Sequence, residues 1–156
     1  MLNIYTVSFF GHREVERFSY IDAQVFSLIR ELIMTKEYVD FLIGRNGEFD
    51  QIVSSAINRV KRNCRDDNSS HILILPYDSA EYRENEASYR NYYDEIEILT
   101  SPDTHYKAAI QRRNRAMVDR SDLVVFYLER ESGGAYQTYR YAVGQGKRIV
   151  KLNANG

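Results

Sequence analysis

Short apolar runs alternate with amphipathic segments along almost the whole chain. The runs are rich in β-branched and aromatic residues and carry few polar positions, a pattern typical of strands that are buried on both faces of a sheet. Glycine, proline or other turn-forming residues follow most of them. The pattern predicts strands at residues 2–9, 39–43, 71–75, 95–99, 123–128 and 148–152.

Between these runs, apolar residues recur at three- and four-residue spacing, which predicts helices with one buried face. Helices are expected at residues 21–36, 49–61, 106–118 and 136–143, with a turn and helix start at Ser101, Pro102 and Asp103. The buried stripe of the first helix is predicted to include Phe18, Ile21, Val25, Leu28, Ile29 and Leu32. That of the second is predicted to be Ile52, Val53, Ala56, Ile57 and Val60.

Strands that alternate with helices indicate an α/β fold with a mainly parallel sheet and helices on both faces. Right-handed crossovers between the strands follow from the chirality of the chain. With 156 residues and neither repeats nor a linker, residues 1–156 are predicted to form a single Rossmann-like domain.

Three of the predicted strands lead into glycine-containing loops. The first loop holds Gly11, His12 and Arg13, the second runs from Gly44 to Gly47, and the third contains Gly133 and Gly134. Ligands of open α/β sheets bind beyond the carboxyl ends of the strands. We therefore expect the three loops to meet at one edge of the sheet.

The third loop has the features of a phosphate site. Glycine allows close approach of the backbone, and a helix that starts just after it offers unpaired N–H groups and a partial positive charge. Thr138 is a candidate hydroxyl donor, and Arg13 or Arg113 a candidate guanidinium contact. The alternative is that each glycine only forms a tight turn between a strand and a helix.

Composition narrows the function classes. The formal net charge is −1, so no global basic field attracts nucleic acid, which we expect to be an unlikely partner. No apolar run is long enough to cross a membrane, and no signal-peptide pattern precedes the first strand, which predicts a cytoplasmic protein. Cys64 is the one cysteine, so an intrachain disulfide is excluded.

Metal and nucleophilic chemistry have little support. His12, His71 and His105 are far apart in sequence and lack ligand spacing, so no metal is expected. His12 has three interpretations, which are loop packing, a phosphate contact and a general base; the phosphate contact is favoured. Asp50 is either a helix-start residue or a ribose contact, and Asp50, Glu48 and Arg113 are the catalytic candidates should the protein be an enzyme.

Residues 77–93 are unusually rich in tyrosine and charge and have no clean period. We expect a partly helical loop region there. Its tyrosines either cover the sheet edge, stack on a base, or form an oligomer contact, and the segment is placed to act as a lid. A homodimer is one of the alternatives that this leaves open.

The segment from Arg113 to Asp122 is followed by a strand, by Gly133–Gly134 and by Thr138. In order and spacing, this run resembles the C-terminal half of the SLOG superfamily, which joins the DprA/Smf proteins to the Lonely Guy enzymes. The early Gly-His-Arg at residues 11–13, and Gly44, Gly47, Phe49 and Asp50, are most similar to the small YpsA-like branch. The resemblance covers nearly the whole chain, from Ser8 to Leu152.

This resemblance implies a Rossmann-like fold with a pocket for a nucleotide or a nucleotide-derived ligand such as an ADP-ribose-like molecule. Arg113 matches the arginine, four residues before a methionine, that serves the phosphoribohydrolase reaction of the Lonely Guy enzymes. Their glutamate does not carry over, because Arg140 stands nearest to its position, and a cation there would oppose the charge that develops on the sugar.

The predicted function is therefore binding of a small nucleotide-derived ligand as a sensor or carrier, with no further cofactor required. The alternative is a nucleotide N-glycosidase or phosphoribohydrolase with a rearranged carboxylate. The predicted ligand-binding residues are Gly11, His12, Arg13, Gly44, Gly47, Asp50, Arg113, Asn114, Gly133, Gly134 and Thr138.

Overall fold

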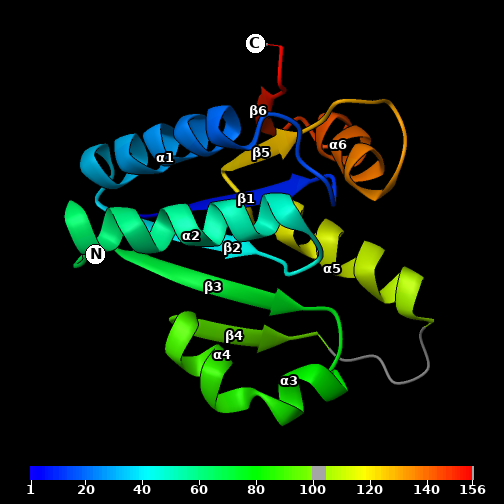
Figure 1. Ribbon diagram of the computed structural model, residues 1–156, viewed down its shortest axis with the longest axis horizontal. Coiled ribbons are helices and arrows are strands. Elements are labelled where there is room, and N and C mark those ends of the chain that lie inside the picture. Colours follow the sequence, from blue (N-terminus) through cyan, green and yellow to red (C-terminus); the bar gives the residue numbers. More distant parts are fainter. Residues whose placement is uncertain (100–104, 156) are drawn as a thin grey trace.

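The computed structural model, which describes residues 1–99 and 105–155, contains a six-stranded sheet in the order β4-β3-β2-β1-β5-β6 (Figure 1). Each pair of neighbouring strands is parallel. The strands are β1 (Ile4–Gly11), β2 (Tyr38–Ile43), β3 (Ser69–Leu75), β4 (Glu95–Ile98), β5 (Leu123–Tyr127) and β6 (Arg148–Leu152). The predicted Rossmann-like α/β fold is confirmed, and within the described residues the sheet is wholly rather than mainly parallel.

Helices cover both faces of the sheet, as expected (Figure 1). On one face lie α1 (Phe18–Thr35) and α2 (Glu48–Asn63), and on the other α5 (Tyr106–Arg120) and α6 (Gly134–Gly144). Two short helices, α3 (Ala80–Glu84) and α4 (Glu86–Tyr92), connect β3 to β4 on the α1–α2 face. The expected partly helical loop at residues 77–93 is therefore two short helices, joined at Asn85.

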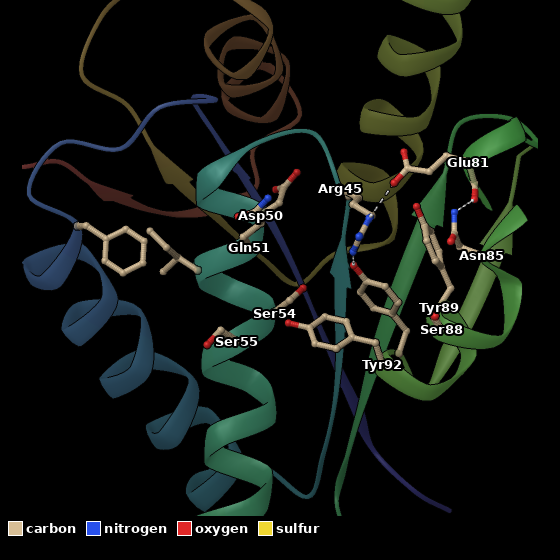
Figure 2. Close-up of a pocket in the computed structure, with 14 residues that line it drawn as sticks. Arg45, Asp50, Gln51, Ser54, Ser55, Glu81, Asn85, Ser88, Tyr89 and Tyr92 are labelled. Carbon is tan, nitrogen blue, oxygen red and sulfur yellow. Dashed lines mark hydrogen bonds and ion pairs between the residues drawn. The ribbon is translucent and has the colours of Figure 1, made fainter.

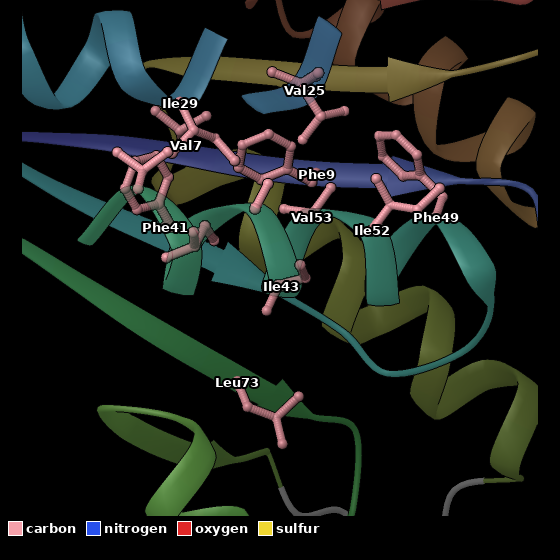
Figure 3. Packing of buried hydrophobic residues seen from close by; sticks show 14 of the residues in the cluster. Val7, Phe9, Val25, Ile29, Phe41, Ile43, Phe49, Ile52, Val53 and Leu73 are labelled. Atoms are coloured by element: carbon pink, nitrogen blue, oxygen red, sulfur yellow. The ribbon is translucent and has the colours of Figure 1, made fainter. Parts of the chain in front are cut away.

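Successive residues of each central strand enter opposite cores, because side chains alternate along a strand. On β2, Phe41 and Ile43 pack with Phe9 and Val53 on the α1–α2 face (Figure 3), whereas Leu42 packs on the α5–α6 face. This two-sided burial explains why the strands are apolar almost throughout.

One residue of the buried stripe that was predicted for α1 is not buried. Phe18 is 53% exposed, whereas Ile21, Val25, Ile29 and Leu32 of the same helix are buried as predicted. Phe18 is the first residue of α1 and lies at the rim of a cavity instead of over the sheet. Helical spacing identifies a face of a helix but does not say where along its length the packed core ends.

The turn expected at Ser101, Pro102 and Asp103 lies outside the described residues. Across residues 1–99 and 105–155, no helix is long and apolar enough to cross a membrane. The extent of the domain, the cytoplasmic location and a homodimer stay predictions.

The order of the strands creates one topological switch point. β1 is paired with β2 on one side and with β5 on the other. The connection through α1 covers one face and that through α5 and α6 the other, so the connections diverge at the carboxyl ends of β1 and β5. In open α/β sheets, this is where a crevice forms.

Candidate functional site

A cavity of about 470 Å³, which we call the glycine pocket, lies at this switch point. All three predicted glycine loops contribute to it, so the expected convergence at one sheet edge is confirmed. Its polar and glycine lining is Gly11, His12, Arg13, Glu14, Gly44, Asn46, Asp50, Arg113, Asn114, Arg130, Gly133 and Gly134. That these residues bind a ligand stays a prediction.

Gly133 and Gly134 form the start of α6. Gly133 is the N-cap and has φ of 90° and ψ of 178°, a conformation that is essentially restricted to glycine. Among the described residues, no side chain caps this helix. The first N–H groups of a helix lack partners within it and carry its positive partial charge, so this end of α6 can accept an anion.

A chain of buried hydrogen bonds supports the pocket from below. Arg113 donates from Nη1 to the carbonyl oxygen of Ile74 (3.0 Å) and from Nε to Oδ1 of Asn114 (2.9 Å). Asn114 donates from Nδ2 to the hydroxyl oxygen of Thr138 (3.1 Å), and that hydroxyl donates to the carbonyl oxygen of Gly134 (3.0 Å). These bonds join the end of β3 to the start of α6.

This network corrects one expectation. Thr138 is 1% exposed, does not line the pocket, and uses its hydroxyl proton on Gly134, so it positions the helix start and is not a ligand donor. Arg113 is 2% exposed, so it does not lie on a solvated face of α5. A carbon added at Gly44 would lie 3.0 Å from Nη1 of Arg113, which shows why this turn lacks a side chain.

Arg113 supplies a buried positive charge. Burial lowers the pKa of its guanidinium, while Asp50 and Tyr77 oppose that change. The group nevertheless stays protonated, because the ordinary pKa of an arginine lies far above neutral pH. Asp50 shows the complementary effect. Burial raises the pKa of its carboxyl group, while the hydrogen bond from the backbone N–H of Asn46 and the charge of Arg113 act to lower it.

His12 is 4% exposed, and its Nε2 has no hydrogen-bond partner in the described part of the chain. Its ring stands edge-on to Tyr127, with 5.8 Å between the ring centroids. Burial, followed by the neighbouring Arg130, lowers its pKa, although Glu129 acts in the opposite sense. His12 is therefore a neutral imidazole at pH 7, with an unsatisfied nitrogen at the wall of the pocket.

Two exposed arginines, Arg13 and Arg130, line the glycine pocket. Arg13 was expected there from the sequence, but Arg130 was missed, because in the loop after β5 it stands between Glu129 and Glu131 and looked like mixed surface charge. Its Nη2 lies 3.9 Å from the position that a side-chain carbon would take on Gly133. A basic residue just before a Gly-Gly helix start is the signal that was available.

The second glycine loop contributes less to the lining than predicted. Gly47 and Glu48 do not line the pocket. A carbon added at Gly47 would lie 2.5 Å from Cα of Arg13, and the N–H of Glu48 donates to the carbonyl oxygen of Arg13 (2.8 Å). Both residues therefore hold the second loop against the first instead of facing a ligand.

Asp50 does line the pocket, but it also has a local role. Its Oδ2 accepts a hydrogen bond from the backbone N–H of Asn46 (2.8 Å), at the start of α2. This bond supports the helix-start interpretation over the ribose contact. Over the described residues, no group of three or more histidines, cysteines and carboxylates is placed to hold a metal ion.

No family model matches the chain, and no curated protein matches it. Solved structures do. A DNA processing protein A from Helicobacter pylori, described by its single-stranded DNA binding mode, superposes with a TM-score of 0.69 and 18% identity. The match covers 95% of this chain and 65% of that protein.

The DNA processing protein A (DprA) of Streptococcus pneumoniae superposes with a TM-score of 0.67 and 16% identity. The match covers 96% of this chain and 50% of that protein. The chain has a DprA-like fold. It spans between half and two thirds of the length of these two proteins. The closer assignment to the YpsA-like branch stays a prediction.

These neighbours correct the predicted partners and function. The DprA-like fold occurs in a protein described by its binding of single-stranded DNA, so the expectation that nucleic acid is an unlikely partner is wrong, and so is the small-nucleotide sensor or carrier. The net charge of −1 was a poor guide to the partner, because it sums the charges of the whole chain and hides a local excess of one sign. Around the pocket, Arg13, Arg113 and Arg130 face only Glu14 and Asp50 as charged lining residues.

The phosphoribohydrolase alternative gains no support either. Arg140, which was expected to stand at the position of the missing glutamate, is exposed and does not line the glycine pocket. The charge argument that rested on Arg140 therefore does not apply to this site.

Proposed function

We propose that this chain binds single-stranded DNA and holds its sugar-phosphate backbone in the glycine pocket. The observation that carries the proposal is the uncapped start of α6 at Gly133–Gly134, in a pocket that Arg13 and Arg130 also line, at the switch point of a DprA-like sheet. The description of the Helicobacter pylori neighbour supports the choice of ligand.

The chemistry of the lining suits a phosphodiester. The N–H groups at the start of α6 are donors for phosphate oxygens, and the guanidinium fork of Arg130 matches two oxygens at once. Arg113 adds a positive charge from below, where water does not screen it fully. Such contacts recognise the backbone and carry no sequence information of their own.

The shape favours a single strand over a duplex. The pocket is a concavity of about 470 Å³ between three loops, which matches one segment of backbone with its sugar. A single strand is flexible enough to enter such a hollow, whereas paired strands are held in a stiff helix.

The test is fluorescence anisotropy of a labelled oligodeoxythymidine, titrated with wild-type protein and with Arg130→Ala. Loss of one charge-assisted contact is expected to weaken binding about tenfold to a hundredfold. The slope of log affinity against log salt is expected to become shallower by about 0.7, since one phosphate contact is lost on a single strand.

Arg65→Ala is the matched control. It removes the same charge from an exposed arginine that follows the last turn of α2, at the opposite edge of the sheet, where it pairs with Asp67 (2.6 Å). Its affinity should stay near that of the wild type. Equal losses in the two variants, or tighter binding of duplex than of single strand, would contradict the proposal.

A further inference from the structure

A second, larger cavity adjoins the glycine pocket. We call it the tyrosine cavity; its volume is about 710 Å³, and it lies between α2 and the α3–α4 segment (Figure 2). Gly44 and Asp50 line both cavities, and of the consecutive residues Arg45 and Asn46 the first lines the tyrosine cavity and the second the glycine pocket. The two hollows therefore meet across the loop that follows β2.

We propose that the tyrosine cavity binds a base of the DNA strand whose backbone lies in the glycine pocket, with Tyr92 as the stacking platform. This inference rests on the proposed function and adds to it the place where a base is held. The size of the cavity falls in the range of sites that enclose small organic groups.

The aromatic wall has an uncovered ring. Tyr89 and Tyr93 are buried, each 5% exposed, whereas Tyr92 is 41% exposed and extends from α4 toward α2 (Figure 2). The rings of Tyr92 and Tyr93 are perpendicular, at 87° with 4.9 Å between centroids, so they do not stack on each other. Tyr92 is thus anchored by an aromatic neighbour while part of its own surface remains open to a planar group.

Besides the tyrosines, the apolar Phe18 and Ile52 and three charged residues, the lining includes five uncharged polar side chains. Hydroxyl and amide side chains come from both walls, and hydroxyls and amides match the donors and acceptors on the edge of a base. They are Gln51, Ser54 and Ser55 from the α2 wall and Asn85 and Ser88 from the other.

Arg45, in the loop between the two cavities, is held in place by three neighbouring side chains. Arg45 donates from Nη1 to the hydroxyl of Tyr93 (3.0 Å), lies over the ring of Tyr89 (4.7 Å to the centroid) and is 3.8 Å from a carboxylate oxygen of Glu81. Because its charge is met by these three groups, Arg45 shapes the rim between the cavities. The phosphate-type chemistry is therefore concentrated in the glycine pocket and the base-type chemistry in the tyrosine cavity.

The experiment compares Tyr92→Ala, Tyr92→Phe and Tyr106→Ala on two strands of equal length, oligodeoxythymidine and an abasic version of it. Tyr106 is a control, because it is exposed and lines neither cavity. Tyr92→Ala should weaken binding of the normal strand about fivefold to a hundredfold, and that of the abasic strand much less, because stacking needs a base. Tyr92→Phe, which keeps the ring, and Tyr106→Ala should bind as the wild type does.

A strand carrying one 2-aminopurine gives a direct readout, since the fluorescence of that base falls when it stacks. Its quenching by the wild type and by Tyr92→Phe, but not by Tyr92→Ala, is expected. If Arg130→Ala weakens binding while Tyr92→Ala has no effect or affects both strands equally, the base site is wrong and the proposed function stands. If the folded wild type binds neither strand, both are wrong. If Tyr92→Ala changes only the sedimentation of the protein, the cavity is an oligomer contact and not a base site.

Discussion

The two cavities are each supported by a buried basic side chain, and the two side chains are in opposite states. Arg113 lies beneath the glycine pocket at 2% exposure, and His71 lies beside the tyrosine cavity at 1% exposure. Burial lowers the pKa of both. Arginine starts so high that it stays charged, whereas the pKa of His71 falls to about 4 and leaves a neutral ring.

The surroundings of His71 match that neutral state. Its ring nitrogens lie 2.9 Å from the hydroxyl of Ser54 and 3.2 Å from Oδ1 of Asn58, and the ring of Tyr93 is 4.7 Å away. One ring N–H and one acceptor nitrogen satisfy these polar partners without a charge. A charged support under one hollow and a neutral one beside the other agree with a phosphate in the first and a base in the second.

Removing the charged support should have the largest effect on stability. Arg113→Ala leaves the carbonyl of Ile74 and Oδ1 of Asn114 without their donor and opens a cavity, so we expect a loss of about 3 kcal/mol in the free energy of unfolding. Denaturant unfolding measures this loss. Arg112→Ala, at an exposed neighbour on the same helix, should change it by less than about 0.5 kcal/mol. Equal stability of the two variants would contradict a supporting role for Arg113.

The neutral state of His71 should make the free energy of unfolding depend on pH. The unfolded chain takes up a proton on His71 near pH 6.5, but the folded chain does so only near pH 4. The stabilisation is therefore complete above about pH 6.5 and is lost as the pH falls toward 4, by a total of about 3 kcal/mol. Unfolding of the wild type and of His71→Gln at a series of pH values should show a shallower slope in the variant.

His105→Gln is the control for that series, because His105 is exposed at the start of α5 and forms no part of either cavity. Its slope between pH 4 and 6.5 should match that of the wild type. A wild-type slope in His71→Gln would show that His71 is not the group that resists protonation.

A smaller effect should separate the glycine pocket from the rest of α6. Gly134→Val adds a side chain at the start of α6. The structure has room for it, since the added Cβ would lie 3.7 Å from Nε2 of Gln111, an ordinary contact distance. The protein should stay folded but bind oligodeoxythymidine about tenfold more weakly or worse, because the valine keeps the backbone of DNA away from the N–H groups. Anisotropy titration provides the measurement.

Gly144→Val is the matched variant at the other end of α6, where an added carbon would meet nothing within 4 Å. It should bind as the wild type does. Unchanged affinity in Gly134→Val, with the fold intact by circular dichroism, would place the backbone of DNA elsewhere.

Much of the fold followed from local pattern. The strand and helix segments were recognisable because side chains alternate along a buried strand and recur every three or four residues along a helix. Gly11, Gly44, Gly133 and Gly134 were recognisable because a turn between a strand and a helix needs a residue without a side chain, most strictly at Gly133. Since parallel strands end at one edge, their convergence also followed.

The roles of individual side chains were less accessible. Thr138 and Glu48 look like ligand residues in the sequence, yet the first is used within α6 and the second joins two loops. Arg130 resembles ordinary surface charge until the loop brings it beside Gly133. A side chain can satisfy the backbone or a ligand, and the choice depends on neighbours that are distant in sequence.

The sequence by itself thus determined the order of the elements, the parallel sheet and the edge at which the glycine loops gather, because each depends on local spacing and on chain chirality. Only the tertiary structure decided that Arg113 is buried beneath one pocket, that His71 is neutral, and that residues 81–93 close a second cavity against α2. Burial and the resulting loss of water set charge and access, and both arise from contacts between segments that the linear pattern does not relate.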